Sequence, residues 1–357
     1  MTSTSSHTPP LPTVTAVVCT HDRPALLRRA LSSLLSQRLP ATEILVVDNA
    51  PSSDATRNLV HGEFPAVRYE HEPVPGLDFA RNRALHAATS DVVAFLDDDA
   101  AADAGWVEAL AHVMRDPHVG MCTGRVEALA TDTEAQRLFE ENGGFSRGME
   151  RRRLPAQAGL ALATWRAAGR GASSGATSRA ARLLPVPLIA CAFDVGAGCS
   201  MAVRRTVAVA LGGFDEALDL GDALPGGGDH DMLWRMLEAG HEVVYEPAAL
   251  AWHEHRREME GVAAQIAGQQ RAMVALLTKC LVTARGRRRA SVAAYLGWRL
   301  VKPGARLIRR AAGRDPLPAW LLARTWRACW RGILEYPRAR RIAMERTTRA
   351  WNQTASQ

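Results

Sequence analysis

The stretch VVAFLDDD, residues 92–99, joins five apolar residues directly to three aspartates, Asp97, Asp98 and Asp99. An apolar run this short predicts a parallel strand that is buried on both faces. The aspartates then fall just beyond its carboxyl end, where open α/β sheets bind their ligands. Crowded carboxylates repel one another, and a magnesium or manganese ion shared with substrate phosphates relieves that repulsion. The stretch therefore predicts a site for a metal ion and a diphosphate.

A solvated acidic turn that caps a helix near Asp103 is the simpler interpretation, because aspartate is common at helix starts. A second acidic cluster favours the metal and diphosphate site over this acidic turn. Residues 226–231 read GGGDHD and open a stretch of helical character at 232–237. Two acidic clusters at the ends of elements suggest one shared site.

Composition limits the class of protein. The chain has 357 residues and is 47% hydrophobic, enough for one large α/β domain with an appendage or for two domains. The six cysteines show no paired or metal-type spacing, which indicates a reducing compartment and no zinc module. Residues 1–12 are polar and Pro-rich, so we expect a disordered tail rather than a secretory signal. With no uncharged apolar run of about 18–20 residues, we expect a cytoplasmic protein.

Charge is distributed unevenly along the chain. Residues 256–357 contain 22 Lys and Arg against 5 Asp and Glu, a net charge of +17, and they hold five of the nine tryptophans. The remaining residues carry 22 basic and 32 acidic side chains, a net charge of −10. This asymmetry predicts a mildly acidic body that carries a basic C-terminal region.

Strand and helix patterns alternate in the first half, which is typical of a doubly wound sheet. Strands are predicted at 14–19, 44–47, 67–69, 92–96, 119–123, 193–203 and 243–245, and helices from Pro24 and at 54–60, 78–88 and 104–114. Residues 150–182 have no clear periodicity and predict a loop or insertion. Residues 256–350 have helical composition, with interruptions expected at Pro303, Pro316, Pro318 and Pro337.

Six segments carry a family resemblance. They are residues 17–24, 43–49, 76–82, 95–99 and 196–202, and the stretch from Gly228 to His253. In this order they resemble the family 2 glycosyltransferases of the GT-A fold. For residues 13–256 the resemblance implies an α/β/α sandwich with a mainly parallel sheet, followed by a helical basic C-terminal region at 257–357. It also implies metal-assisted, inverting transfer of a sugar from a nucleotide-diphospho-sugar to a hydroxyl of a glycan, a lipid-linked sugar or a small molecule.

The resemblance assigns the nucleotide site residue by residue. It places Thr20, Asp22 and Arg23 beside the ribose and base, and makes Asp48 an acceptor at the edge of the base. Asp48 also fits a simple turn residue. Its position at the carboxyl end of a predicted core strand favours the functional interpretation.

The diphosphate and the metal would share one group of residues. Arg81 would face the diphosphate, since a guanidinium fork suits phosphate oxygens, although an exposed helix arginine is as good an interpretation. Asp99 is the expected metal ligand of the family's DXD motif, with Asp97 or Asp98 contacting the ribose or the metal. His253 matches a histidine that approaches the metal in many such enzymes. A lone histidine is more often a surface or core residue.

Asp229 occupies the position of the family's catalytic base, at the start of a predicted helix whose dipole favours the charged carboxylate. An N-cap aspartate is the alternative, and both roles can coexist. The family usually has a glutamate where this chain has Gly228, which leaves a non-catalytic nucleotide-sugar-binding protein as the competing function. Asp231 and Arg235 are four residues apart and predict a structural pair.

Two other enzyme classes fit less well. A nicotinamide-dependent oxidoreductase needs a G-x-G-x-x-G turn after the first strand, where this chain has Thr20-His21-Asp22-Arg23. A nucleotidylyltransferase would need a glycine-rich loop at the same place.

The basic region suggests attachment to a surface. Arginines that alternate with Leu, Ile and Trp suit interfacial helices on an anionic membrane, which would bring the enzyme to a lipid-linked acceptor on the cytoplasmic face. A solvated helical face packed on the catalytic domain is the alternative. Basic helices can also bind RNA, but no recognised nucleic-acid module accompanies them, and we expect no nucleic-acid partner.

Overall fold

The computed structural model describes residues 9–154 and 195–354. Its centre is one sheet, with strand order β3-β2-β1-β4-β8-β6-β9-β5 and with β7 paired to β9. The strands are β1 Val14–Thr20, β2 Glu43–Asn49, β3 Arg68–Glu72, β4 Val92–Leu96, β5 Ala100–Ala102, β6 Val119–Ala128, β7 Arg152–Leu154, β8 Ser200–Arg204 and β9 Glu242–His253. Neighbours among the first four strands are parallel, so their carboxyl ends share one edge. Beyond them the sheet is mixed, because β8 runs antiparallel to both β4 and β6.

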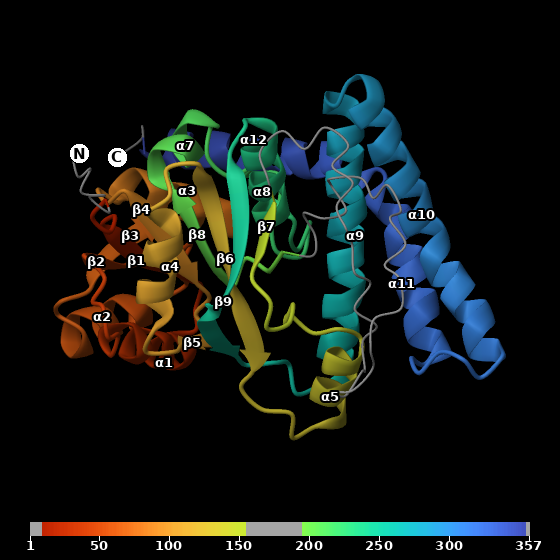
Figure 1. Cartoon of the computed structure of the whole chain (residues 1–357), viewed down its shortest axis with the longest axis horizontal. Helices are drawn as coiled ribbons and strands as arrows, with labels where there is room; N and C mark the ends of the chain where they lie inside the picture. The colour runs from red at the N-terminus through yellow and green to blue at the C-terminus, as the bar shows by residue number, and fades with distance from the viewer. Residues whose placement is uncertain (1–8, 155–194, 355–357) are drawn as a thin grey trace, which may run out of the picture.

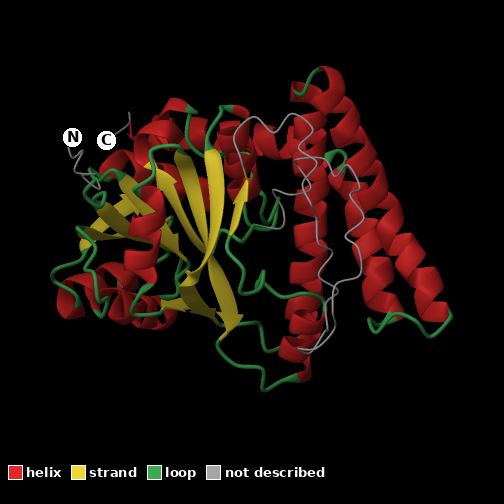
Figure 2. Ribbon diagram, viewed as in Figure 1, coloured by secondary structure: helices red, strands yellow, loops and turns green. Residues whose placement is uncertain are grey.

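Helices cover both faces of the sheet (Figures 1 and 2). One face packs against α1 Pro24–Leu35, α2 Ala55–Glu63 and α4 Trp106–Met114. The other packs against α3 Leu77–Ala87, α7 Arg205–Ala210 and α8 Gly228–Glu238. The predicted α/β/α sandwich is therefore confirmed.

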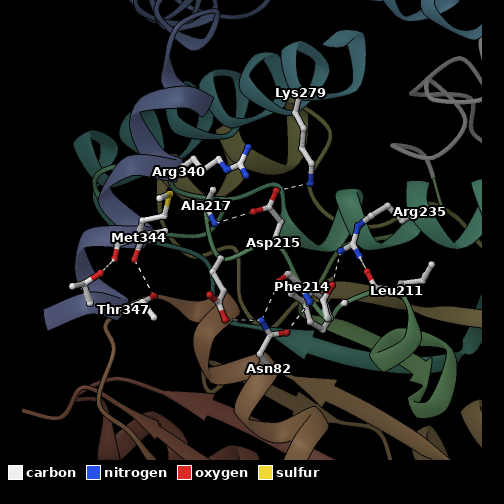
Figure 3. Close-up of a pocket in the computed structure, with 15 residues that line it drawn as sticks. Asn82, Leu211, Phe214, Asp215, Ala217, Arg235, Lys279, Arg340, Met344 and Thr347 are labelled. Carbon is white, nitrogen blue, oxygen red and sulfur yellow. Dashed lines mark hydrogen bonds and ion pairs between the residues drawn. The ribbon is translucent and has the colours of Figure 1, made fainter. Parts of the chain in front are cut away.

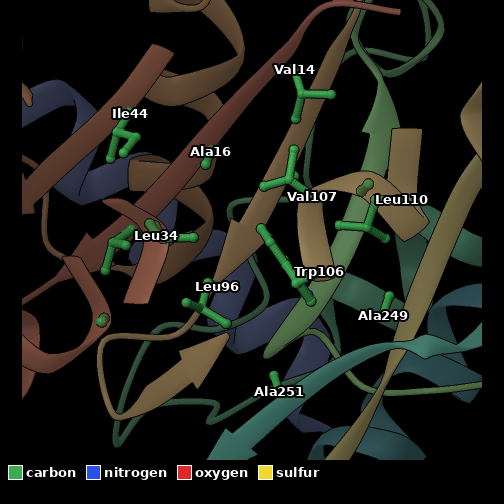
Figure 4. Close-up of a cluster of buried hydrophobic side chains, with 14 of the residues drawn as sticks. Val14, Ala16, Leu34, Ile44, Leu96, Trp106, Val107, Leu110, Ala249 and Ala251 are labelled. Carbon is green, nitrogen blue, oxygen red and sulfur yellow. The ribbon is translucent and has the colours of Figure 1, made fainter. Parts of the chain in front are cut away.

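Strand β4 explains why its sequence is apolar without alternation. All five of its residues are buried, and alternate side chains enter different core clusters, Leu96 on one face and Phe95 on the other. Trp106 fills the first cluster beside β4 (Figure 4). Its indole N–H donates a hydrogen bond of 2.9 Å to Oγ of Ser200, which ties α4 to β8.

Two sequence expectations for the middle of the chain need correction. The strand predicted at 193–203 begins only at Ser200. Before it, Gly196 adopts φ +124° and the amide of Ser200 bonds back to the carbonyl of Ala197, which makes a turn instead of an extended chain. The loop predicted at 150–182 starts with a short strand, β7, that pairs with β9. The rest of that loop, residues 193 and 194, and most of the tail at 1–12 lie outside the described residues.

The C-terminal region is helical, as predicted. It comprises α9 Met259–Thr283, α10 Gly286–Ala311, α11 Ala319–Gly332 and α12 Glu335–Thr354, while α5 Glu134–Glu141 packs beside α9. Helix α12 returns to α3 and α8, because its Ala339 and Ala343 share a buried cluster with Phe79 and Trp234, whereas α10 and α11 lie on the far side of α9 (Figure 1). In the part of the chain that the structure describes, no helix combines the length and apolarity needed to cross a membrane.

The interruption predicted at Pro303 is wrong, because α10 runs through it. Proline has no backbone N–H, so the carbonyl of Arg299, four residues earlier, loses its helical donor. The indole N–H of Trp326 on α11 donates a hydrogen bond of 2.9 Å to the carbonyl of Leu300. This bond ties α10 to α11 one residue from the carbonyl of Arg299 and does not replace the bond that the proline removes.

Candidate active site

The aspartates after β4 lie among polar groups from the end of β1. Oδ2 of Asp98 accepts a hydrogen bond of 2.7 Å from the hydroxyl of Thr20 and lies 3.1 Å from Nε of Arg23. Nη1 of Arg23 lies 3.4 Å from Oδ2 of Asp99. Burial raises the pKa of Asp98 to about 7, even though Arg23 and Thr20 act in the opposite direction. These contacts join the carboxyl ends of two neighbouring strands into one polar group.

His253 reaches the same group from the last residue of β9. Its Nε2 lies 3.1 Å from Oδ1 of Asp99, and the imidazole is only 6% exposed. The pairing of β5 with β9 sets this approach, because Ala100 lies opposite His253 in the register. Burial lowers the pKa of His253, but the hydrogen bond and charge of Asp99 outweigh it, and the net shift is upward.

Asp97, Cys199 and His253 form a compact set of potential metal ligands. One ligand atom from each lies within 4.8 Å of the others. Burial raises the pKa of Asp97 to about 6, with Asp99 adding to the effect, and burial raises the pKa of the Cys199 thiol well above its usual range. A thiol that stays protonated is a poor ligand. Carboxylates are the ligands that magnesium and manganese prefer, so Asp97 and Asp99 fit such a cation better than Cys199 does, and the imidazole of His253 lies beside them.

Asp229 lies in the first turn of α8, with both carboxylate oxygens engaged. Oδ2 accepts a hydrogen bond of 2.7 Å from the backbone N–H of Gly198, and Oδ1 lies 2.8 Å from both the backbone nitrogen and Nδ1 of His230. Burial alone would raise the pKa of Asp229, but the charge and hydrogen bonds of His230 shift it below its usual range. The carboxylate is therefore ionised at neutral pH. The alternative of an N-cap aspartate is wrong, because the N-cap position is Gly227 and Asp229 lies inside the helix.

Arg81 is buried rather than exposed, contrary to the alternative interpretation, and is 4% accessible. Its Nη1 lies 2.9 Å from Oδ1 of Asp78 and 3.3 Å from Oδ2 of Asp219. A Cβ at Gly198 would lie 3.1 Å from Nη2 of Arg81 and 3.0 Å from Oδ2 of Asp229. Glycine at 198 thus lets the guanidinium and the carboxylate approach the same point of backbone.

Asp48 and Asp22 lie farther along the same sheet edge. Oδ2 of Asp48 accepts a hydrogen bond of 2.9 Å from the hydroxyl of Tyr69, whereas its buried Oδ1 has no hydrogen-bond partner among the described residues. Burial raises the pKa of Asp48. Asp22 adopts φ +53°, and its Oδ1 accepts a hydrogen bond of 3.0 Å from the amide of Ser52. An unpartnered buried acceptor at a strand end suits a ligand that donates a hydrogen bond.

This geometry agrees with a comparison against protein families. Residues 15–167 match the model of glycosyl transferase family 2. This segment belongs to that family. It contains the strands from β1 to β7 and every predicted site residue except Asp229 and His253.

Individual relatives agree with this assignment. The pre-mycofactocin glycosyltransferase of Mycobacterium tuberculosis is 28% identical over 248 residues, which cover 69% of this chain and 43% of that protein. The succinoglycan biosynthesis protein ExoM of Rhizobium meliloti is 34% identical over 118 residues, or 31% of this chain and 38% of that protein. The chain thus covers less than half the length of either relative.

A solved structure extends the likeness to the fold of nearly the whole chain. The mannosyltransferase PcManGT from Pyrobaculum calidifontis, in complex with GDP-Man and Mn²⁺, aligns with a TM-score of 0.53. The alignment covers 93% of this chain and 87% of that one at 19% identity. It supports the GT-A fold.

The structure brings most of the predicted site residues together. Thr20, Arg23, Asp98, Asp99 and His253 form one connected group, Asp97 lies within 4.8 Å of His253, and Arg81 and Asp229 adjoin each other at Gly198. No hydrogen bond or ion pair among the described residues links Asp22 or Asp48 to that group. The predicted pair of Asp231 and Arg235 is confirmed at 2.7 Å.

Sequence reasoning missed Asp78, Cys199 and Asp219. Asp78 and Cys199 lie inside segments that carry the family resemblance, and that position was the available signal. Asp219 had none. It lies in an irregular stretch before α8, and its role depends on φ +49° and on contacts with Arg81 and Gly228.

A pocket of about 650 Å³ lies apart from this group, between the stretch 211–217, α9 and α12 (Figure 3). Its charged side chains largely satisfy one another. Lys279 pairs with Asp215, and Arg235 donates to the carbonyls of Leu211 and Gly213. We therefore interpret the pocket as part of the packing of the C-terminal region.

Proposed function

We propose that this protein is a metal-assisted glycosyltransferase that moves a sugar from a nucleotide-diphospho-sugar to a hydroxyl acceptor with inversion at the anomeric carbon. One observation carries the proposal. An ionised carboxylate, Asp229, lies beside the buried Arg81, next to a group that combines three aspartates with His253. This arrangement offers a base for the acceptor and a cationic and metal-binding surface for the leaving diphosphate.

Asp97, Asp99 and His253 are the residues that would hold Mg²⁺ or Mn²⁺. The Mn²⁺ named with PcManGT supports a divalent ion in this fold. When bound, the ion would stabilise the negative charge that develops on the diphosphate.

The nucleotide would lie along the edge formed by β1, β2 and β4. The free Oδ1 of Asp48 would accept a hydrogen bond from the base. Asp22, Thr20 and Arg23 would bind the ribose side, together with Asp98. Arg81 would face the diphosphate with Nη2, because Nη1 is already occupied by Asp78 and Asp219.

The transfer would be a single displacement. Asp229 accepts the proton of the acceptor hydroxyl while that oxygen forms a bond to the anomeric carbon. The bond from this carbon to the diphosphate oxygen breaks, and the nucleoside diphosphate leaves with the electron pair. Attack opposite the leaving group inverts the anomeric centre.

The test is binding followed by turnover. Thermal unfolding is measured with UDP, GDP, ADP, CDP and dTDP, each with and without Mn²⁺. The nucleotide that shifts the melting temperature then identifies the donor class to be assayed. Binding without transfer to any glycan, lipid-linked or small-molecule acceptor would favour the competing function, a nucleotide-sugar-binding protein. The absence of binding in a folded sample would overturn both.

We also infer that the basic C-terminal region attaches this enzyme to the cytoplasmic face of an anionic membrane. Helix α10 exposes Trp298, Val301 and Ile308, of which Ile308 is 74% accessible. Their spacing of three and seven residues places them on one side of the helix. Lys302 lies 4.6 Å from the centre of the Trp298 ring, and the region as a whole has a net charge of +17. An apolar stripe within a strongly cationic region suits an anionic bilayer surface.

The acceptor class follows from that attachment. A membrane-bound enzyme would meet a lipid-linked sugar, and the relative named for succinoglycan biosynthesis supports a role in polysaccharide assembly.

A further inference from the structure

One buried carboxylate beside the proposed site has no role in the mechanism above. Asp78 lies in the first turn of α3, and its side chain is fully buried. Oδ1 lies 2.9 Å from Nη1 of Arg81, but Oδ2 has no hydrogen-bond partner among the described residues. Leaving a buried carboxylate oxygen unpartnered is unfavourable, so its position calls for an explanation.

The neighbouring helix provides one. A Cβ built on Gly228, the first residue of α8, would lie 1.9 Å from Oδ2 of Asp78 and 2.5 Å from its Cγ. Gly228 is not among the residues with positive φ. Its backbone conformation therefore does not require glycine. Glycine is required because the carboxylate of Asp78 occupies the space that a side chain at 228 would need. Asp78 and a side chain at position 228 compete for the same space.

Asp78 also controls the direction of Arg81. Nη1 of Arg81 contacts both Asp78 and Asp219, and Asp219 accepts a hydrogen bond of 2.8 Å from the amide of Gly228. The guanidinium is planar and rigid, so holding Nη1 fixes where Nη2 points. Nη2 is thereby left on the side of Gly198 and Asp229.

We propose that Asp78 is a positioning residue, which supplies from α3 the carboxylate at the amino end of α8 and holds Arg81 beside Asp229. Burial raises the pKa of Asp78 well above its usual range, and the guanidinium of Arg81 acts in the opposite direction. This role rests on the proposed function, in which Arg81 faces the diphosphate of the donor.

Exchanging the two residues tests the shared space. The single variants Asp78→Ala and Gly228→Asp are compared with the double variant Asp78→Ala/Gly228→Asp by thermal unfolding without nucleotide. Gly228→Asp alone should lower the melting temperature by about 5 °C, because two carboxylates then occupy one site. The double variant should melt above Gly228→Asp alone. If the loss in melting temperature of the double variant equals the sum of the losses in the single variants, the two side chains do not share one space.

Nucleotide binding tests the positioning role. The probe is whichever of UDP, GDP, ADP, CDP and dTDP binds the wild-type protein most tightly with Mn²⁺, measured by calorimetry. Asp78→Ala should weaken binding by about tenfold, since Arg81 then loses one of its two carboxylate partners. The double variant should recover most of this loss. Unchanged affinity in Asp78→Ala would overturn the role.

A matched control separates positioning from stability. Asp231 is a buried aspartate of α8 that also pairs with an arginine, Arg235, but it lies away from Gly198. Asp231→Ala should lower the melting temperature while leaving nucleotide affinity unchanged. If the wild-type protein binds no nucleotide, the proposed function fails, whereas the thermal comparison still decides whether Asp78 and residue 228 share one space.

Discussion

The backbone N–H of Gly198 donates a hydrogen bond of 2.7 Å to Oδ2 of Asp229, across 31 residues of sequence. This bond connects the turn before β8 to the first turn of α8. The donor that holds the proposed base here is a backbone N–H and not a side chain. The bond also brings the two chain segments so close that no Cβ fits at position 198, since one would lie 2.8 Å from Cβ of Asp229.

Gly198→Ala should therefore reduce transfer by at least about tenfold while the protein remains folded, because the added methyl group displaces Asp229 or Arg81. Steady-state kinetics and thermal unfolding measure the two effects. Gly297→Ala is the matched control, since a Cβ there meets no atom within 4 Å. Equal activity in both variants would contradict the close packing.

Asp229→Asn should reduce the turnover number by about 10²- to 10⁴-fold, because the amide cannot accept the proton of the acceptor hydroxyl. The affinity for the nucleoside diphosphate with Mn²⁺ should stay within about threefold of wild type, since the side chain keeps its size. Kinetics and calorimetry on the same preparation separate the two quantities. Retained turnover would rule out Asp229 as the base.

The stability contributed by Asp229 should depend on pH in a defined direction. Its pKa is lowered in the folded protein, so the contribution is present above the unfolded value near 3.8 and is lost as the pH falls below it. The difference in unfolding free energy between wild type and Asp229→Asn should thus shrink between pH 6 and about pH 3. Urea unfolding at several pH values measures it. A difference that grows on acidification would reverse the sign of the shift.

Removal of the metal ion should abolish the thermal stabilisation by nucleotide. Chelation with EDTA should remove the shift, and Asp99→Ala should remove it even in excess Mn²⁺, because a carboxylate ligand is lost. Cys199→Ser serves as the control for the neighbouring thiol and should keep the shift. If Cys199→Ser lost the thermal shift and Asp99→Ala kept it, the proposed metal ligands would be wrong.

Membrane attachment should depend on both the charge of the lipid and the apolar stripe of α10. The full-length protein should sediment with vesicles that contain phosphatidylglycerol and remain unbound to vesicles of phosphatidylcholine alone. Trp298→Ser/Ile308→Ser should weaken sedimentation by about tenfold. The control Val209→Ser changes an exposed apolar residue of α7, 39% accessible, and should bind as wild type. Equal binding to both kinds of vesicle would contradict the proposal.

Local sequence was sufficient for most elements and for the residue types that gather at the candidate site. Strand β4 and the aspartates after it could be predicted because an uninterrupted apolar run and the acidic residues next to it are neighbours in the chain. The strand start at Ser200 could not, because it depends on a left-handed glycine at 196. Nor could the continuation of α10 through Pro303, beside which Trp326 of another helix donates a hydrogen bond to the carbonyl of Leu300.

The sequence by itself determined an α/β/α sandwich, a basic helical C-terminal region and the acidic residue types of the candidate site, because periodicity, charge and motif spacing are local properties. Only the tertiary structure decided which groups meet. It brought His253 to Asp99, buried Arg81 between Asp78 and Asp219, and set the carboxylate of Asp78 where residue 228 would carry a side chain. Such contacts depend on how the β strands pair and how α3 packs beside α8, and that information is spread over the whole chain.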